Sequence, residues 1–127
     1  MPTRNPTPSE HEFFFNNRDV PGYAAPDNHV VFNPYVMMDP RMKQAIMANE
    51  MARIAMRTGL MPQYKDPLTQ QQQQLVQSNR VYGKADPQTQ RDTMMARMYS
   101  GDPSGGTPND LQAQYLKLLQ RAVESMR

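Results

Sequence analysis

The chain has 127 residues, of which 38% are apolar, and it contains 12 prolines and no cysteine. Its mean hydropathy is -0.82, so a compact core must come from a few segments rather than from the whole chain. Without cysteine the chain has no disulfide scaffold, no thiolate metal ligand and no thiol nucleophile. The formal net charge of +2 is small for a domain that binds nucleic acid nonspecifically.

The apolar runs of the chain are too short for a membrane-spanning segment and are not placed as in a secretion leader. No apolar run approaches the roughly 20 residues of a transmembrane helix, and no basic stretch followed by an apolar one opens the chain. We therefore expect a soluble protein without a standard secretion leader. The 12 methionines either fill irregular gaps in a core or form apolar surface that adapts to a partner; we favour core filling.

Residues 1–38 contain six prolines, which remove backbone donors and bias the preceding residues toward extended geometry. We predict that this segment is a long, extended, proline-rich N-terminal arm without a helix, and that residues 39–127 form a small helical domain. The arm has too many aromatic side chains for a solvated spacer, so we expect it to order on a partner. The candidate partner-binding residues are Phe13, Phe14, Phe15, Tyr23, Phe32 and Tyr35.

The stretch His29–Phe32 is the one credible strand in the arm, because it is rich in β-branched and aromatic residues and ends before an Asn-Pro pair. A single strand needs a partner edge. Two interpretations are open. Either the edge belongs to another chain, as in strand addition, or the stretch packs on the helices without a strand partner. We favour packing on the helices.

Asp-Pro pairs divide the rest of the chain, at Asp39–Pro40, Asp66–Pro67, Asp86–Pro87 and Asp102–Pro103. Aspartate caps the free amides of a first turn, and proline is tolerated at the first helical position. The first three pairs predict helices over about 40–58, 67–79 and 87–99. The fourth lies in a glycine-rich loop, which precedes a predicted helix over about 108–126 capped by Thr107. The predicted fold class is therefore mostly α, with about four short helices.

The first predicted helix ends at Gly59, and four of its charged residues fall on one narrow stripe at about 100° per residue. The stripe consists of Lys43, Glu50, Arg53 and Arg57. Methionines and alanines cover most of the remaining circumference. A helix that is apolar over so wide an arc is enclosed on more than one side, either by the rest of this chain or by a neighbouring subunit.

Asn49, Glu50 and Arg53 form the most specific polar group of this helix and are the candidate structural polar network. Glu50 and Arg53 lie one turn apart and can pair, which as a solvated ion pair is worth a few tenths of a kcal/mol. Alternatively, Asn49 points into the apolar arc and binds the backbone of the arm, because a buried amide must be satisfied. The sequence leaves both interpretations open.

No pattern of residues indicates catalysis. The two histidines, His11 and His29, both lie in the arm and far in sequence from Ser78 and Ser100, and no HExxH, Walker or GxGxxG motif occurs. We expect no enzymatic activity, no cofactor and no metal.

Two groups of motifs support a resemblance. The first is Val31–Val36, followed by Asn49-Glu50-x-x-Arg53-x-x-x-Arg57; the second is Thr93–Arg97 followed by Ser100–Ser104. Over about residues 30–126 the chain resembles small uncharacterised virion proteins of tailed bacteriophages. The resemblance implies a structural component of the particle, located in the head interior or around the portal and tail, present in several copies and held by its neighbours.

We therefore expect a non-enzymatic structural or assembly component of a phage particle. It contacts neighbouring virion subunits through its arm and apolar helices, is made in the bacterial cytoplasm and resides in the virion. The alternative is a small helical regulator that binds nucleic acid or a host enzyme. Its contact face comprises Arg41, Lys43, Arg53 and Arg57, although the small basic excess does not favour nucleic acid.

Overall fold

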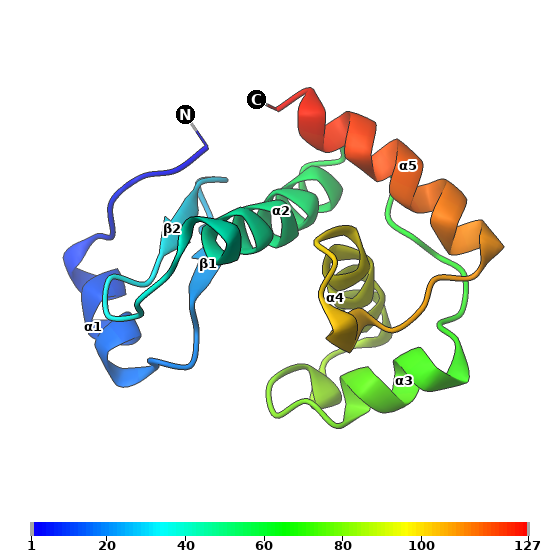
Figure 1. Cartoon of the computed structure of the whole chain (residues 1–127), viewed down its shortest axis with the longest axis horizontal. Helices are drawn as coiled ribbons and strands as arrows, with labels where there is room; N and C mark the ends of the chain where they lie inside the picture. Colours follow the sequence, from blue (N-terminus) through cyan, green and yellow to red (C-terminus); the bar gives the residue numbers. More distant parts are fainter. Residues whose placement is uncertain (1, 127) are drawn as a thin grey trace.

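The computed structural model describes residues 2–126, which are mostly helical and form two lobes (Figure 1). The N-terminal lobe, residues 2–38, contains α1 (Pro8–Asn16), β1 (Gly22–Ala24) and β2 (Val30–Phe32). The helical lobe, residues 39–126, contains α2 (Pro40–Arg57), α3 (Gln70–Gln77), α4 (Pro87–Tyr99) and α5 (Asp110–Glu124), with single turns of 3-10 helix η1 (Tyr82–Lys84) and η2 (Pro103–Gly105). The mostly α fold class is confirmed, with five α-helices in the described residues where about four were predicted.

The N-terminal segment is not an extended arm, and the prediction that it contains no helix is wrong. Thr7 and Glu10 form a capping box at the start of α1: the Thr7 hydroxyl accepts from the Glu10 N–H at 3.3 Å, and the Glu10 carboxylate accepts from the Thr7 N–H at 2.9 Å. Pro8 occupies the first helical position, where the missing donor costs nothing. A proline that we took as evidence against a helix therefore starts one.

The predicted strand is present as β2, and its partner belongs to the same chain. β1 pairs antiparallel with β2, with Tyr23 opposite Val31. The connecting turn places Asn28 at a φ of 65°, a region that asparagine tolerates better than most residues. On the other side of β2, Thr3 forms an isolated parallel bridge with Val30. The prediction that this stretch packs on the helices is therefore correct only in part. Val30 is buried in the core that the helices form, but the stretch is also paired with a strand of the same chain.

The N-terminal lobe has a small core of its own, separate from that of the helical lobe. Phe14, Ala25 and Val31 are fully buried in it, and Val20 and Tyr23 pack against them. These residues bring α1 and the hairpin together, so the lobe is a folded unit with one buried aromatic side chain at its centre.

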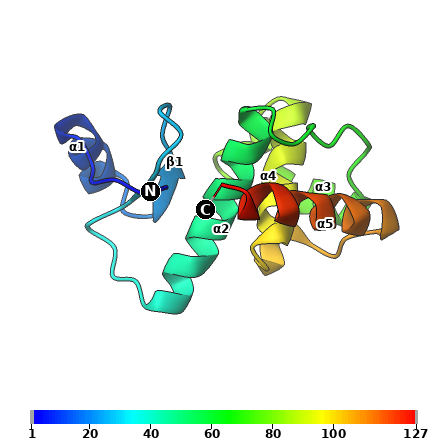
Figure 2. The same ribbon diagram turned by 90° about the horizontal axis from the view of Figure 1, so that it is seen from above.

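α2 lies between the hairpin on one side and α4 and α5 on the other (Figure 2). As predicted, it begins after Asp39, whose carboxylate accepts from the Met42 N–H at 2.7 Å, and it is followed by Gly59 at a φ of 78°, a conformation that favours glycine. Its C-terminal half is buried, whereas its first residues are exposed. This chain's own elements therefore enclose the wide apolar arc, but only over half of the helix.

Of the other three predicted helix starts, only that of α4 is confirmed. α4 begins at Pro87 with Asp86 as its N-cap. In contrast, α3 begins at Gln70 and α5 at Asp110, capped by Thr69 and Asn109. Both of these caps form capping boxes with a glutamine three residues on, which satisfies two amides where an Asp-Pro pair satisfies one. The two predicted helices are therefore present, but their starts at about Pro67 and Pro108 were placed three and two residues too early.

The two glutamines of these capping boxes also join α3 to α5. Gln72 and Gln112 are both fully buried, and their side-chain amides exchange hydrogen bonds of 2.7 and 2.8 Å. Around them the core is rich in methionine, including Met51, Met94 and Met95, each at most 1% exposed. Core filling is therefore the role of these methionines.

Candidate functional site

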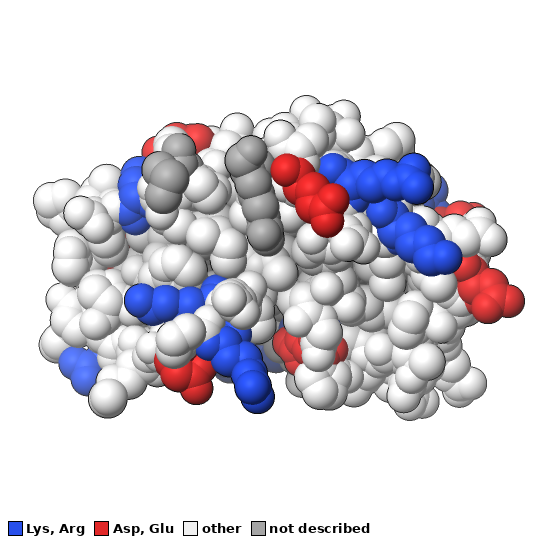
Figure 3. All heavy atoms as spheres, turned by 45° about the horizontal axis from the view of Figure 1, so that its top comes forward, with Lys and Arg blue, Asp and Glu red and all other residues white. Residues whose placement is uncertain are grey.

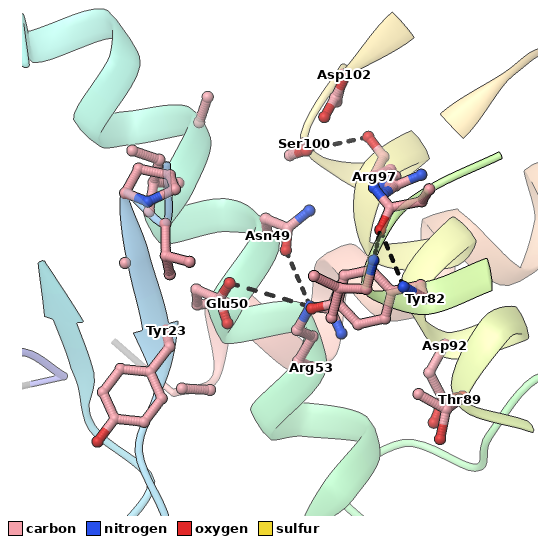
Figure 4. A pocket seen from close by; sticks show the side chains of 18 of the residues that line it. Tyr23, Asn49, Glu50, Arg53, Tyr82, Thr89, Asp92, Arg97, Ser100 and Asp102 are labelled. Atoms are coloured by element: carbon pink, nitrogen blue, oxygen red, sulfur yellow. Dashed lines mark hydrogen bonds and ion pairs between the residues drawn. The ribbon is translucent and has the colours of Figure 1, made fainter. Parts of the chain in front are cut away.

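A cleft of about 1310 Å³ is lined by residues of both lobes and lies beside their contact at α2. One wall consists of β1 and the loop before it. The other consists of one side of α2, the segment around η1 and the C-terminal end of α4. Figure 4 shows side chains of α2, including Asn49, Glu50 and Arg53, facing Tyr82 and Arg97 across part of the cleft. A second cavity, between α2, α4 and α5, has a smaller volume of about 700 Å³.

On the α2 side, Glu50 and Arg57 bind the outer edge of β1. The Ala24 N–H lies near the Glu50 carboxylate and favours its charged form. The Arg57 guanidinium donates to the Ala24 carbonyl at 3.2 Å, to the Ala25 carbonyl at 2.7 Å and to Asn28 Oδ1 at 2.8 Å. Burial raises the pKa of Glu50, and the charge of Arg53 and the Ala24 amide partly offset this rise. Side chains of α2 therefore occupy the Ala24 groups at the free edge of β1, where a strand from another chain would otherwise pair.

The hairpin also approaches α2 closely because position 22 is glycine. A Cβ atom at Gly22 would lie 3.1 Å from Ile46 Cγ2 of α2 and equally close to the Val31 carbonyl oxygen. These contacts and those of Glu50 and Arg57 fix the N-terminal lobe on α2 and set the width of the cleft.

The structure brings Asn49, Glu50 and Arg53 together on the cleft side of α2 (Figure 4). Arg53 Nε donates to Asn49 Oδ1 at 3.1 Å and lies 4.0 Å from Glu50 Oε1. Asn49 thus holds Arg53, whereas Glu50 and Arg57 make the contacts with the backbone of residues 2–38 that we had assigned to Asn49. The side chains of Glu50 and Arg53 are only 14% and 19% exposed, so this is not a solvated surface pair.

Deeper in the cleft, two arginines lie over one tyrosine ring. The Cζ atoms of Arg53 and Arg97 are 4.9 and 5.7 Å from the centre of the Tyr82 ring. Arg97 is buried, and burial lowers its pKa, while the charge of Asp102 acts in the opposite direction. Arg97 is not among the candidate site residues predicted from the sequence. Its signal was a lone charge within the apolar run Met94–Met98.

The candidate partner-binding aromatics divide into three groups. Phe14 is buried in the core of its own lobe and offers no surface to a partner. Tyr23 packs on Phe14, with its hydroxyl bonded to Glu10, and Phe32 lies beneath Lys43. The exposed group comprises Phe13, Phe15 and Tyr35, with 46%, 55% and 41% of their surface accessible.

Phe15 and Tyr35 belong to one surface, which we call the aromatic surface and define as His11, Phe15, Arg18 and Tyr35. The Phe15 and Tyr35 rings meet edge to face at 5.5 Å, and His11 packs against Tyr35 at 6.0 Å. The Arg18 guanidinium lies over both the Phe15 and Tyr35 rings, at 5.0 and 5.6 Å. These contacts hold the exposed rings in fixed orientations.

Within residues 2–126, no group of three or more histidine, aspartate or glutamate side chains is close enough together to hold a metal ion. None of the helices over the same residues is both long and apolar enough to cross a membrane. Neither histidine lines the cleft. The polar side chains that line it are mainly arginines, carboxylates and amides, groups that bind and orient another molecule through hydrogen bonds and charge.

Comparisons with protein-family models, with curated proteins and with solved structures find no match to this chain. The aromatic surface and the cleft are therefore the features from which a function can be inferred.

Proposed function

We propose that the chain is a non-enzymatic structural or assembly component of a tailed-phage particle, present in several copies, and that it contacts neighbouring virion subunits through the aromatic surface. One observation carries the proposal: two large aromatic rings of a small folded lobe stay half exposed while an arginine and a histidine hold them in place. Aromatic side chains with fixed orientations lose little entropy on binding and contribute strongly to interfaces.

Other exposed apolar residues support the same interpretation. Met37, two residues beyond Tyr35, is 97% exposed, and Met42 at the start of α2 is 39% exposed. Methionine adapts to irregular partner surfaces. Together with Phe13, Phe15 and Tyr35, these residues concentrate exposed large side chains between positions 13 and 42. The resemblance of Val31–Val36 and of the Asn49–Arg57 helix to virion proteins points in the same direction.

The alternative, a regulator that binds nucleic acid or a host enzyme, receives less support from the geometry. Arg57 is exposed, but its guanidinium is engaged with the hairpin backbone. Arg53 is engaged with Asn49 and Tyr82, so only Arg41 and Lys43 of the proposed basic face are exposed without such hydrogen bonds. Acidic and basic side chains are interspersed on the face shown in Figure 3. Nucleic acid prefers a contiguous basic surface.

The proposal can be tested with particles of the phage that encodes the chain. A tagged full-length chain is produced during infection, particles are purified by density-gradient sedimentation, and the chain is quantified in them. We expect the wild-type chain to be in the particles. The double variant Phe15→Ser, Tyr35→Ser should be incorporated roughly ten-fold less or worse, because each ring is an interface anchor.

The matched control is Leu118→Ser on α5, where a leucine is 51% exposed but has no place in the aromatic surface. This variant should be incorporated like wild type, and circular dichroism should show equal helix content in all three chains. A wild-type chain that stays out of the particles contradicts the virion assignment. Normal incorporation of the double variant contradicts the role of the aromatic surface.

A further inference from the structure

The inner wall of the cleft carries a buried arginine without an acidic partner. Arg97 is 8% exposed, and in the described part of the chain no carboxylate oxygen lies within 4.0 Å of its guanidinium nitrogens. Its Nη1 atom lies 3.5 Å from the Ser104 carbonyl oxygen and 3.7 Å from Met94 Sδ, which are long for hydrogen bonds. The other N–H groups of this guanidinium have no hydrogen-bond partner within residues 2–126.

A second cation lies nearby and makes this arrangement less favourable. Arg53 shares the Tyr82 ring with Arg97, and its charge adds to the effect of burial in lowering the pKa of Arg97. The charge of Asp102 offsets this effect only in part, because the pKa of Arg97 remains lowered. The planar fork of an arginine matches a carboxylate, which can accept two parallel hydrogen bonds from it. A carboxylate entering the cleft would therefore relieve an unfavourable arrangement that the free chain contains.

The carboxylates already in the cleft have other contacts. Asp19 pairs with Arg80, Glu50 with Arg53, Asp92 accepts from Gln63 and Gln88, and Asp102 accepts from the Ser104 N–H. The lining contains four arginines and four acidic residues, so it has no formal net charge. A polyanion such as nucleic acid needs several free cations. A single carboxylate needs one arginine fork, and Arg97 supplies it.

The size and walls of the cleft indicate what carries this carboxylate. Its volume of about 1310 Å³ exceeds the roughly 300–1,000 Å³ of typical small-molecule pockets. Apolar side chains line both walls, with Val20 and Pro21 before β1 and Ala45 and Ile46 on α2. Successive side chains of an extended peptide point in opposite directions. Such a peptide can place one side chain at Arg97 and its neighbours on the apolar walls.

We propose that the cleft binds an extended segment of a neighbouring virion subunit, in which one aspartate or glutamate pairs with Arg97 and the adjacent apolar residues pack on α2 and on the loop before β1. This inference rests on the proposed function and adds a second contact to that of the aromatic surface. It names the chemistry of the segment: a single acidic residue between apolar ones.

The experiment begins with peptides selected from a random library on the immobilised full-length chain. The enriched peptides are synthesised with blocked ends, and their affinity for the chain is measured by isothermal titration calorimetry. We expect them to share one acidic residue with apolar neighbours. Replacement of that residue by its amide should weaken binding at least ten-fold, because it removes one partner of a buried charge pair.

The Arg97→Met variant then completes a double-mutant cycle. The acidic peptide and its amide version should bind this variant with affinities equal to within about two-fold, because the partner of the carboxylate is gone. Arg41→Met, an exposed arginine outside the cleft, is the matched control and should retain the full difference. Arg97→Lys keeps the charge without the fork and serves as the second variant if Arg97→Met does not fold.

Several results would overturn the inference. These are enrichment of no peptide, equal binding of the acid and amide peptides to the wild-type chain, and full competition by inorganic phosphate, which would assign the site to phosphate. Phe15→Ser should leave peptide binding unchanged, because the aromatic surface lies outside the cleft. Loss of incorporation in particles and loss of peptide binding are therefore separate readouts of the two proposals.

Discussion

The two lobes are stabilised in different ways. The helical lobe has a continuous core, rich in methionine and alanine, that is contributed mainly by four helices and that also includes Val30 of β2. The N-terminal lobe has three fully buried apolar residues and depends on polar contacts around them. Arg4 pairs with Glu10 and Asp27, and Glu10 also caps α1 and bonds the Tyr23 hydroxyl. A segment too short and too rich in proline for a large core can fold when side chains satisfy its backbone.

Asn33 illustrates this difference. Its side chain is 1% exposed, and its amide nitrogen donates to the carbonyl oxygens of Phe14, Asn17 and Val20 at 3.4, 3.3 and 2.8 Å. Its Oδ1 atom accepts from the Tyr35 N–H at 2.8 Å. One side chain thus joins the end of α1, the following loop and the segment after β2. In the helical lobe, comparable joints are made mainly by apolar packing.

The largest expected effect comes from a cavity in either core. Phe14→Ala should destabilise the N-terminal lobe by about 3–5 kcal/mol, and Met94→Ala should destabilise the helical lobe by about 2–5 kcal/mol. Hydrogen exchange measured by mass spectrometry should separate the two. Phe14→Ala should speed exchange in residues 2–38 and leave α4 and α5 protected. Equal loss of protection in both lobes would show that they unfold as one unit.

Asn33→Ala should have a somewhat smaller effect, about 2 kcal/mol, because it leaves the Val20 carbonyl oxygen and the Tyr35 N–H without partners. The loss of stability is measured from the hydrogen exchange of residues 2–38 at increasing urea concentrations. Asn16→Ala is the control, since the exposed Asn16 donates only to a carbonyl within its own helix. If Asn33→Ala is no more destabilising than Asn16→Ala, polar contacts do not hold the lobe.

Acid should weaken the N-terminal lobe first. The hydrogen bond with Arg4 holds the pKa of Glu10 well below its ordinary value of 4.5. Because the folded-state pKa is depressed, this stabilisation is present above about pH 4.5 and is lost as the pH falls toward the folded-state pKa. Burial shifts the pKa of Glu50 upward, so protonation of Glu50 in acid has the opposite sign and favours the folded state.

Hydrogen exchange of residues 2–38, compared between about pH 6 and about pH 3 after correction for intrinsic rates, tests this dependence. In Glu10→Gln, the increase in exchange between neutral and acid pH should be largely gone. The N-terminal lobe of this variant should already be less stable than wild type at neutral pH. Glu12→Gln, at an exposed position of the same helix, should retain the wild-type pH dependence. An unchanged pH profile in Glu10→Gln would show that other carboxyl groups govern the acid response.

The smallest expected effect concerns the ion pair between Asp19 and Arg80, which joins the N-terminal lobe to the segment after α3. Their side chains are 59% and 74% exposed, and exposed pairs contribute little. Arg80→Ala should change the free energy of unfolding by less than about 1 kcal/mol. Small-angle X-ray scattering should show the same radius of gyration with and without the substitution. An expanded variant would show that this pair, rather than α2, sets the width of the cleft.

The sequence by itself determined the local structures that depend on neighbouring residues. Asp39–Pro40 and Asp86–Pro87 located the starts of α2 and α4, Gly59 located an end, and the β-branched stretch at Val30–Phe32 located a strand. These local structures can be predicted because the hydrogen bonds of a cap or a turn are made between groups only a few residues apart in the sequence. Capping boxes at Thr7, Thr69 and Asn109 have the same local origin and were readable from sequence, although proline content was weighed above them.

The tertiary structure alone decided the rest. That Phe14 is buried while Phe15 is exposed depends on which side of α1 meets the hairpin. That Glu50 and Arg57, rather than Asn49, bind the edge of β1 depends on how the hairpin docks on α2. Arg97 became a candidate binding residue only when folding buried it beside Arg53 and Tyr82. Each of these outcomes depends on contacts between residues far apart in the chain, and a pattern of neighbouring residues does not encode which distant groups meet.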